Sequence, residues 1–478
     1  MKKIRKMMAL FFCFALFVSM SPITSLAANT IGSGKCGEEA YWKITDDAIL
    51  RISGKGEVTE HPWIEYDDER YPSFIYPVKN IIVEEGITSI CYDAFDYCSS
   101  LEEAHLPNSL SEISEWQFTG CTSLTGVWVN NDNPNYSNDS RGVLLNKDKT
   151  ELHIFPQGIS GEYDIPDTVK RLTIYEFSES KVSSIRIPAS VEEAHGDAFQ
   201  DCPLLKKIIV DSNNPYFSND DNGALFNKDK TELLRLPGGF VGEYIVPDTV
   251  ISMPRDSEKG GGVFSDCRFL TSVVIPEGIK LIDAYSFMDC ISLTNVKLPE
   301  SLETIEFGAF DGCSSLYSIT IPRNVSYIGW HAFSIYEEYD GVLEGNTSLF
   351  SILFEGNAPK TDTESYESGA FFNVKATAYY PMNNSSWTEE ARHNLGEYLV
   401  WEEYDPASPP VFASHKMGDI DGDDSVTNTD LVTIARYIVG LSDDKISVAV
   451  KNYADMNGDG NVDNLDIVTV ARMIVGLQ

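Results

Sequence analysis

The residues best suited to chemistry lie in two acidic loops near the C-terminus, GDIDGDDSVTNTDLVTIARYIVGL and, 36 residues later, ADMNGDGNVDNLDIVTVARMIVGL. Oxygen-bearing side chains recur at positions 1, 3, 5 and 12 of both loops, namely Asp419, Asp421, Asp423, Asp430, Asp455, Asn457, Asp459 and Asp466. A hard cation such as Ca²⁺ takes about six or seven oxygen ligands, and alternating carboxylates around a tight turn supply them. We therefore expect two calcium ions, one in each loop.

The remaining ligand positions fit the same metal. Ser425 and Asn461, at position 7, would each contribute a backbone carbonyl, while Thr427 and Asp463, at position 9, could act through water. The alternative is an acidic loop of solvated aspartates. Two copies in register, each running directly into an apolar stretch, favour the metal loops.

Two short helices must position these loops. Residues 431–439 and 467–475 are apolar at i, i+3 and i+4 spacing, which predicts helices that pack mainly against each other. Two features depart from an EF-hand. Position 12 is Asp in both loops rather than Glu, and the first loop follows Pro-Pro and Lys-Met-Gly rather than a helix.

A calcium loop with only its exiting helix resembles the type I dockerin family, and the match runs from about residue 417 to 478. The resemblance implies a cohesin partner and two structural calcium ions. Asp424 stands at position 6 of the first loop where the second has Gly460, which makes the first site less ideal. The resemblance also places cohesin contacts near loop positions 10 and 11 and on the helix face, at Asn428, Thr429, Arg436, Asn464, Leu465 and Arg472.

A 23-residue period organises most of the chain before these loops. It spaces Phe264, Phe287, Phe310 and Phe333, the pair Phe95 and Phe118, and the prolines Pro276, Pro299 and Pro322. One unit has the form I-x4-F-x2-C-x2-L-x2-I-x-I-P. Such a period predicts a solenoid, in which each unit buries its apolar side against its neighbours. The L-x-x-I-x-I portion alternates like a short strand and predicts a parallel sheet on one face.

These units resemble the BspA-type leucine-rich repeat family, with motifs such as ITSICYDAFDYCSSLEEAHLP and LETIEFGAFDGCSSLYSITIP. The resemblance covers roughly residues 75 to 400. The opening GKCGEEAYWKITDDAILRISGKGEV is similar to the strand-rich N-terminal cap of that family, and ATAYYPMNNSSWTEEARHNLGEYLVWEEY to its terminal unit. It implies an α+β repeat fold, a leucine-rich-repeat solenoid with parallel strands.

Two longer inserts, residues 129–169 and 210–250, break the period and match each other at an offset of 81 residues. Asn-Lys-Asp-Lys between two apolar runs is turn chemistry, so each insert is expected to form a β-hairpin beside the solenoid. Because the inserts are duplicated, we interpret them primarily as structural elements of the repeat array.

The expected domain organisation follows the composition. Residues 1–28 have a positive start, an apolar stretch and small residues at the end, which predicts a secretory signal peptide. A strand-rich cap (29–77), the repeats (78–404), a Pro-rich linker (405–416) and a small all-α, calcium-binding dockerin (417–478) follow. No later stretch of about twenty apolar residues is present, so we expect a secreted protein without membrane insertion, associated with a scaffold or a cell surface.

Charge and cysteine usage narrow the partners. A formal net charge of −37 argues against nucleic acid and anionic membranes, both of which need counter-charge. Five cysteines sit at one repeat position, which predicts a buried ladder of reduced thiols rather than disulfides: Cys98, Cys121, Cys267, Cys290 and Cys313. Cys36 and Cys91 lie outside this ladder, and the sequence leaves their state open.

The repeat register also predicts which side chains the sheet face displays: Glu103, His105, Trp128, Arg186, Ile209, Val274, Lys297, Thr320 and Leu353. This column is more apolar than a solvated face requires. Either it binds a ligand or the inserts cover it.

No catalytic constellation accompanies these features, since the histidines are not paired at metal-ligand spacing and no nucleophile or nucleotide motif occurs. The sequence therefore predicts a non-catalytic binding or adhesion protein, attached through its dockerin to a cohesin on a cellulosome-like scaffold. Two alternatives remain: a structural spacer without a ligand, or a cellulosomal enzyme with cryptic polysaccharide or peptide hydrolase activity.

Overall fold

The structure is a computed structural model that describes residues 28–66, 72–114, 116–255, 261–337, 343–362, 369–410, 426–438, 462 and 464–474. The predicted signal peptide, except residue 28, and the second half of the predicted linker lie outside the described residues. Within the described part of the chain, no helix combines the length and apolarity needed to cross a membrane.

An antiparallel meander closes the N-terminal end, formed by β1 (Thr30–Lys35), β2 (Glu39–Thr45) and β3 (Ile49–Val58). β3 then pairs in parallel with β6 (Asn80–Val83) and, further along, with β7 (Ile87–Ile90), beside a hairpin of β4 (Ile64–Tyr66) and β5 (Pro72–Phe74). Trp63 is fully buried, and its indole N–H donates to the Ala94 carbonyl at 2.6 Å. This bond ties the meander to the first repeat.

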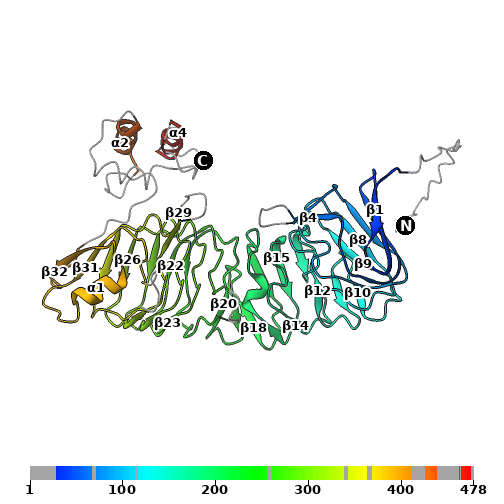
Figure 1. Cartoon of the computed structure of the whole chain (residues 1–478). Coiled ribbons are helices and arrows are strands. Elements are labelled where there is room, and N and C mark those ends of the chain that lie inside the picture. Colours follow the sequence, from blue (N-terminus) through cyan, green and yellow to red (C-terminus); the bar gives the residue numbers. More distant parts are fainter. Residues whose placement is uncertain are drawn as a thin grey trace, which may run out of the picture.

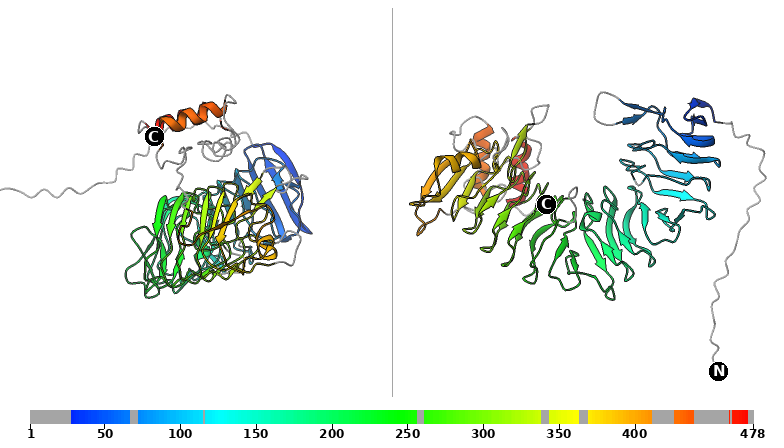
Figure 2. Two further views of the ribbon diagram at one scale, coloured as in Figure 1. Left: turned by 90° about the vertical axis from the view of Figure 1, so that its left-hand side faces the viewer. Right: turned by 60° about the horizontal axis from the view of Figure 1, so that its bottom comes forward.

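Each repeat then adds one strand to a parallel sheet on one face of an arc-shaped solenoid (Figures 1 and 2). The first sheet continues from β6 to β8 (Glu103–Leu106) and β9 (Gly126–Val129). Two three-stranded sheets follow, β13 (Ser160–Asp164), β15 (Lys181–Ile187), β17 (Lys207–Val210), and β21 (Gly242–Ile245), β22 (Leu270–Val274), β24 (Asn295–Lys297). The last comprises β26 (Ser318–Ile321), β30 (Ser351–Phe354), β31 (Thr377–Pro381) and β32 (Val400–Tyr404).

Short elements complete the coils away from this face. They are β14 (Arg171–Leu172), β16 (Glu193–Ala194), the 3-10 helix η1 (Gly196–Phe199), β23 (Leu281–Ile282), β25 (Thr304–Ile305), β27 (Tyr327–Ile328), the hairpin β28 (Ile335–Glu337) and β29 (Leu343–Gly345), and helix α1 (Glu389–Leu395). Thr388 caps α1, because its hydroxyl accepts the Ala391 N–H at 3.1 Å.

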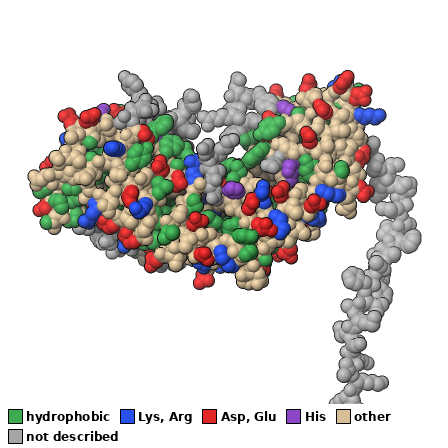
Figure 3. All heavy atoms as spheres, turned by 90° about the horizontal axis from the view of Figure 1, so that it is seen from below, with side chains coloured by type: hydrophobic (Ala, Val, Ile, Leu, Met, Phe, Trp, Pro, Cys, Tyr) green, Lys and Arg blue, Asp and Glu red, His purple; other side chains and the backbone are tan. Residues whose placement is uncertain are grey.

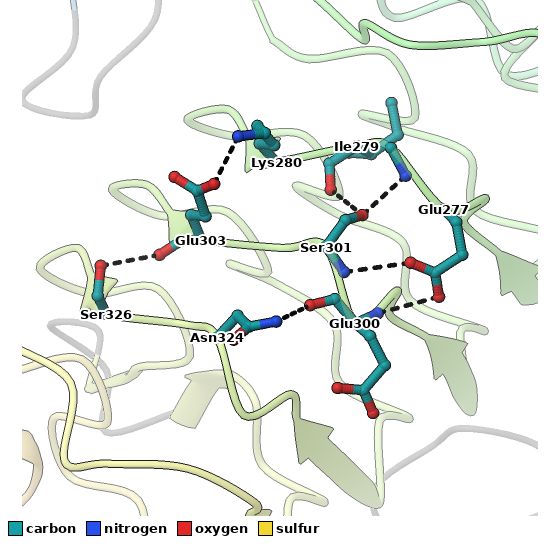
Figure 4. Close-up of polar contacts among 9 residues, drawn as sticks. Glu277, Ile279, Lys280, Glu300, Ser301, Glu303, Asn324 and Ser326 are labelled. Carbon is teal, nitrogen blue, oxygen red and sulfur yellow. Dashed lines mark hydrogen bonds and ion pairs between the residues drawn. The ribbon is translucent and has the colours of Figure 1, made fainter.

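Side chains at matched positions hold successive coils in register, as Figure 4 shows. The Glu277 carboxylate accepts the backbone N–H groups of Glu300 and Ser301, at 3.1 and 3.2 Å. Ser301 also donates its hydroxyl to the Ile279 carbonyl at 2.8 Å. Lys280 pairs with Glu303 at 2.7 Å, but both side chains are exposed, so this pair contributes little. The backbone contacts therefore do more of the work of aligning the coils.

Stacked rings and thiols fill the interior. Phe264, Phe287, Phe310 and Phe333 are fully buried and stack at centroid distances of 4.7–4.8 Å. The predicted ladder cysteines are buried, and their thiols donate to carbonyls of the preceding coil, for example Cys290 Sγ to Phe264 O at 3.0 Å. Burial raises the pKa of the Cys98 thiol to about 12. These cysteines therefore act as small apolar donors inside the core.

Each insert forms a three-stranded antiparallel sheet. The first contains β10 (Tyr136–Asn138), β11 (Leu144–Asn146) and β12 (Leu152–Ile154), and the second β18 (Phe217–Asn219), β19 (Leu225–Asn227) and β20 (Leu233–Arg235). The Asn-Lys-Asp-Lys turn joins the second and third strands of each, so a further strand is added to the expected hairpin.

The inserts also divide the interior into three apolar clusters. Because side chains alternate along a strand, Leu144 packs into the first cluster and its neighbour Leu145 into the second. In the other insert Leu225 belongs to the second cluster and Phe226 to the third. Each insert thus separates two apolar clusters and contributes side chains to both.

Near the C-terminus, α2 (Asn428–Ile438) and α4 (Asn464–Ile474) pack against each other (Figure 1). Ile434 and Val470, at matched positions of the duplicated sequence, are the fully buried residues between them. The predicted apolar helices therefore have the expected common core.

Candidate functional site

Of the predicted calcium ligands, Asp430 and Asp466 lie in the described residues, as the third residues of α2 and α4. The other predicted ligands lie outside them: Asp419, Asp421, Asp423, Ser425, Asp455, Asn457, Asp459 and Asn461. Among the described residues, no group of three or more His, Cys, Asp and Glu is placed to hold a metal ion.

The chemistry of Asp430 nevertheless fits a calcium loop. This carboxylate is fully buried at the start of α2, and its Oδ2 accepts the Thr427 N–H at 2.8 Å and the Thr427 hydroxyl at 3.3 Å. Burying a carboxylate is costly unless it is paired or coordinates a cation. Thr427 thus holds Asp430 at the start of α2, the position at which the sequence predicts the twelfth loop ligand.

The predicted cohesin-contact residues of the first copy are all exposed to solvent. Asn428 and Thr429 are exposed at the start of α2, and Arg436 is exposed in its last turn. Their counterparts Asn464, Leu465 and Arg472 lie on α4. Each set therefore lies on a single helix. The first two residues of the set are at the N-terminal end of the helix, and the arginine is near its C-terminal end.

Sequence reasoning missed one matched pair on the same helices. Val432 and Val468 are 58% and 52% exposed, although valine is mostly buried in folded proteins. They occupy equivalent positions of the two copies. The signal was present in the sequence as a valine preceding a threonine in both helices, but periodicity alone assigns such a residue to the core.

The predicted outward column is seen in the strand register. His105 lies opposite Trp128, Arg186 opposite Ile209, and Val274 opposite Lys297. Ile209 is 38% exposed, and Ile245, opposite Val274, is 62% exposed. Apolar side chains therefore do reach the open sheet face.

Two members of the column are less accessible than predicted. Trp128 is half-buried because its ring lies over Gly126 and Gly142, and Gly142 belongs to the first insert. Insert cover therefore applies to this residue. The prediction that Leu353 is exposed was wrong, since it is 6% exposed, in register with Thr320 and the ring-bearing Tyr379 on the strands beside it.

Charges on the repeats are mixed. Figure 3 shows acidic, basic and hydrophobic side chains interspersed on the face seen from below. Several pairs join neighbouring coils, such as Lys170 with Glu192 at 2.6 Å and Arg323 with Glu300 at 2.9 Å. The acidity of the chain is thus partly compensated along the coils.

Comparison with known proteins identifies both parts of the chain. The BspA type leucine-rich repeat region matches in six copies over residues 73–140, 154–232 and 257–356. The dockerin type I domain matches residues 417–475. No curated protein shows significant similarity to the chain.

Several solved structures are similar at low identity. A leucine-rich cell surface protein from Faecalibacterium prausnitzii is 18% identical, with a TM-score of 0.44, over 77% of this chain and 98% of that one. The pneumococcal vaccine antigen PcpA is 16% identical, with a TM-score of 0.41, over 78% and 99%. A leucine-rich repeat protein from Eubacterium ventriosum is 20% identical, with a TM-score of 0.32, over 62% and 92%.

The family matches fix what the two parts are. A dockerin implies binding to a cohesin and attachment of the cellulosome type, and leucine-rich repeats are protein-interaction modules. Both matched families are non-catalytic, and no catalytic domain is found in the chain. The chain belongs to the BspA-type leucine-rich repeat family and carries a type I dockerin domain at its C-terminus.

Proposed function

We propose that this chain is a secreted, non-catalytic binding protein that its dockerin attaches, calcium-dependently, to a cohesin on an extracellular, cellulosome-like scaffold. The dockerin match over residues 417–475 carries this proposal, together with the duplicated loop and helix inside it. The repeats then present their open sheet face and coil edges to a ligand or partner. The proposed boundaries are a signal peptide (1–28), cap (29–77), repeats (78–404), linker (405–416) and dockerin (417–478).

Calcium would be held by the two loops. Asp419, Asp421, Asp423, Ser425 and Asp430 would hold one ion, and Asp455, Asn457, Asp459, Asn461 and Asp466 the other. When bound, the ion offsets the repulsion of converging carboxylates. Asp430 supports this role because it is already buried and oriented by Thr427 at the start of α2. By fixing the start of each helix, the loops would hold the exposed faces of α2 and α4 in place for a partner.

The duplication suggests two docking orientations. The sequences LVTIARYIVGL and IVTVARMIVGL differ by few side chains, and Ile434 and Val470 occupy equivalent places between the helices. A half-turn about an approximate two-fold axis would then exchange the two faces. Arg436 would take the place of Arg472, and Val432 that of Val468.

Binding of the mature chain to a panel of type I cohesins tests the attachment. We expect capture in millimolar calcium and its loss in excess chelator. Arg436→Ala and Arg472→Ala should each be tolerated, while the double variant should lose binding, because one intact face suffices. Loss of capture by either single variant would exclude two orientations, and capture that persists in chelator would exclude the calcium requirement.

A second set of measurements separates the alternatives for the repeats. Hydrolysis of plant polysaccharides or casein by the mature chain would establish the cryptic enzyme instead. A pull-down with the chain anchored on its cohesin tests whether the repeats bind a partner. Recovery of nothing beyond the cohesin would leave the structural spacer.

A further inference from the structure

A pocket of about 200 Å³ opens beside the first insert, where the coil containing Phe118 meets the coil containing Phe177. The side chains that matter most around it are Trp116, His153, Gln157, Tyr175, Glu176 and Glu179. Trp116 is 41% exposed, and its ring meets that of Tyr175 edge to face at 5.7 Å. The pocket thus combines two aromatic rings with two carboxylates.

At the second insert the chain fills the equivalent place itself. Ile154 of the first insert corresponds, 81 residues on, to Arg235, which is fully buried. The Arg235 guanidinium donates to the Gly262 carbonyl at 3.0 Å, to the Ser265 hydroxyl at 2.9 Å and to the Ser265 carbonyl at 2.8 Å. A guanidinium is therefore the group that this architecture accepts at the seam between coils.

The acceptors that surround Arg235 have counterparts around the open pocket. The coils that follow the two inserts both run Phe-Ser-acid, so Ser178 and Glu179 correspond to Ser265 and Asp266. Both Ser178 and Glu179 line the pocket. The first insert therefore keeps a hydroxyl and a carboxylate at this seam, but it has isoleucine where the second insert has the arginine.

Gln157 adds an acceptor that the second insert lacks, since Gly238 stands in its place. Its Oε1 is buried and has no hydrogen-bond partner in the structure, while its Nε2 donates to Glu179 Oε2 at 3.0 Å. A buried carbonyl without a donor is costly. An N–H group entering the pocket would satisfy it.

The surroundings of the pocket are acidic. Glu176 is fixed at its rim, because Oε2 accepts the Thr173 N–H at 2.9 Å and the Thr173 hydroxyl at 2.7 Å. Burial raises the pKa of Tyr175, and the negative charges of Asp197 and Asp201 raise it further, although Arg255 opposes them. The field around the rings therefore favours a cation.

We propose that this pocket binds the guanidinium group of an arginine side chain presented by a protein partner. The Trp116 and Tyr175 rings would contact the flat cation, and Glu179 with Gln157 Oε1 would accept its N–H groups. A lysine ammonium cannot present the same planar fork of donors. This inference deepens, and rests on, the proposal that the repeats bind a partner, and it is independent of cohesin docking.

Calorimetric titration of the cohesin-anchored mature chain with a capped Gly-Arg-Gly peptide tests it, against the same peptide with lysine and against cellobiose. We expect saturable binding of the arginine peptide, with affinity for the lysine peptide weaker by about tenfold or more, as for loss of a charge-assisted hydrogen bond. Preference for cellobiose would make the pocket a carbohydrate site and overturn the proposal, as would binding of none of the three. Failure to anchor on the cohesin would concern the dockerin alone.

Variants locate the binding. Ile154→Arg should abolish it, because the new side chain would fill the pocket from inside as Arg235 does in the second insert. Trp116→Ala, at an exposed ring, gives a second variant that spares the fold, and Glu179→Gln should weaken binding by about tenfold. Glu162→Gln removes one charge from an exposed strand position outside the pocket and is the matched control. Equal losses in Glu179→Gln and Glu162→Gln would reduce the effect to bulk charge and contradict the proposal.

Discussion

The two inserts share their polar framework almost residue for residue. Asn133 and Asn214 are both fully buried, and each donates from Nδ2 to two carbonyls of the preceding coil. In the same way a tyrosine hydroxyl reaches an aspartate in each insert, at 2.9 and 3.0 Å. The groups that fix the backbone are therefore the ones that both copies retain.

The inserts differ where they face the next coil. Ile154 leaves a pocket, whereas Arg235 fills the equivalent seam with three hydrogen bonds. The two copies therefore share the hydrogen bonds that fix the backbone of the insert and differ in the side chain that faces the next coil. Four substitution experiments, in order of expected size, test how far the two copies are alike.

Removal of the Arg235 side chain should have the largest effect. Arg235→Ala leaves buried acceptors at Gly262 and Ser265 unpaired and should cost about 3–5 kcal/mol, whereas Ile154→Ala removes only apolar contacts and should cost about 2–3 kcal/mol. Because a repeat array need not unfold in one step, amide hydrogen exchange in β20 and β22 is the suitable measurement. A smaller loss for Arg235→Ala than for Ile154→Ala would show that the buried guanidinium is dispensable.

The coil that follows the second insert should also be sensitive to pH. Burial, followed by the charge of Asp201, raises the pKa of Asp266 to about 7. Between about pH 4 and 7 the folded protein keeps this proton and the unfolded chain releases it, so the free energy of unfolding falls as the pH rises through this window. The fall should amount to about 4 kcal/mol, since the pKa values of the folded and unfolded states differ by about three units and one unit corresponds to about 1.4 kcal/mol.

Asp266→Asn checks this pH dependence, because asparagine keeps the shape without the charge. Thermal unfolding should show the variant more stable than the parent at pH 8 and similar to it at pH 4. Glu179→Gln, at the corresponding position of the coil after the first insert, is the control, since Glu179 is exposed. Identical profiles for the parent and Asp266→Asn would contradict the assignment.

The glycines next to the preceding strand should show that the scaffolds are equivalent. Gly142 and Gly223 have φ of +81° and +80°, and an added Cβ would lie 2.6 Å from the Gly126 Cα and 2.7 Å from the Lys207 Cα. Alanine at either position should cost about 2 kcal/mol, from backbone strain and close contact together. Gly161→Ala separates the two causes, since Gly161 has φ of +79° and open space around it. Urea titration would reveal non-equivalence as clearly unequal losses.

The smallest expected effect concerns the edge of the parallel sheet. Asn138 Oδ1 accepts the Val129 N–H at 2.7 Å, and Asn219 Oδ1 accepts the Val210 N–H at 2.8 Å. Alanine should cost about 1 kcal/mol at each site, the usual value of one hydrogen bond. Aspartate keeps the acceptor and should restore part of the loss. Thermal midpoints unchanged by both alanines would mean that water replaces the amide.

The periodic parts of the fold were predictable because stacking requires the same residue type at the same interval. This is why the phenylalanine stack and the thiol ladder could be inferred from spacing alone. Cys202 was missed, although Phe199 precedes it by the same three residues, because its coil lies between the two inserts. Its thiol is buried and donates to the Phe177 carbonyl at 2.9 Å.

The site was less predictable, for a physical reason. Ligands of a metal loop are adjacent in sequence, so the acidic loops can be recognised directly. The pocket beside the first insert joins Trp116, Gln157 and Glu179, which only the path of the insert brings together. Equally, an arginine after a turn such as Arg235 is expected in solvent, and only the packing of the next coil reveals that it is buried.

The division of the interior into three clusters determines how the chain would yield under tension. Within a cluster each ring stacks on the rings of the neighbouring coils, so the unfolding of one coil removes the packing of the next. At an insert, the two faces of one small sheet belong to different apolar clusters, so the continuous stacking of side chains is interrupted there. A chain anchored at its C-terminal domain and pulled from its other end would therefore lengthen in three bursts. Each insert is the boundary at which one unfolding step ends, so the clusters between that insert and the anchored end would remain folded.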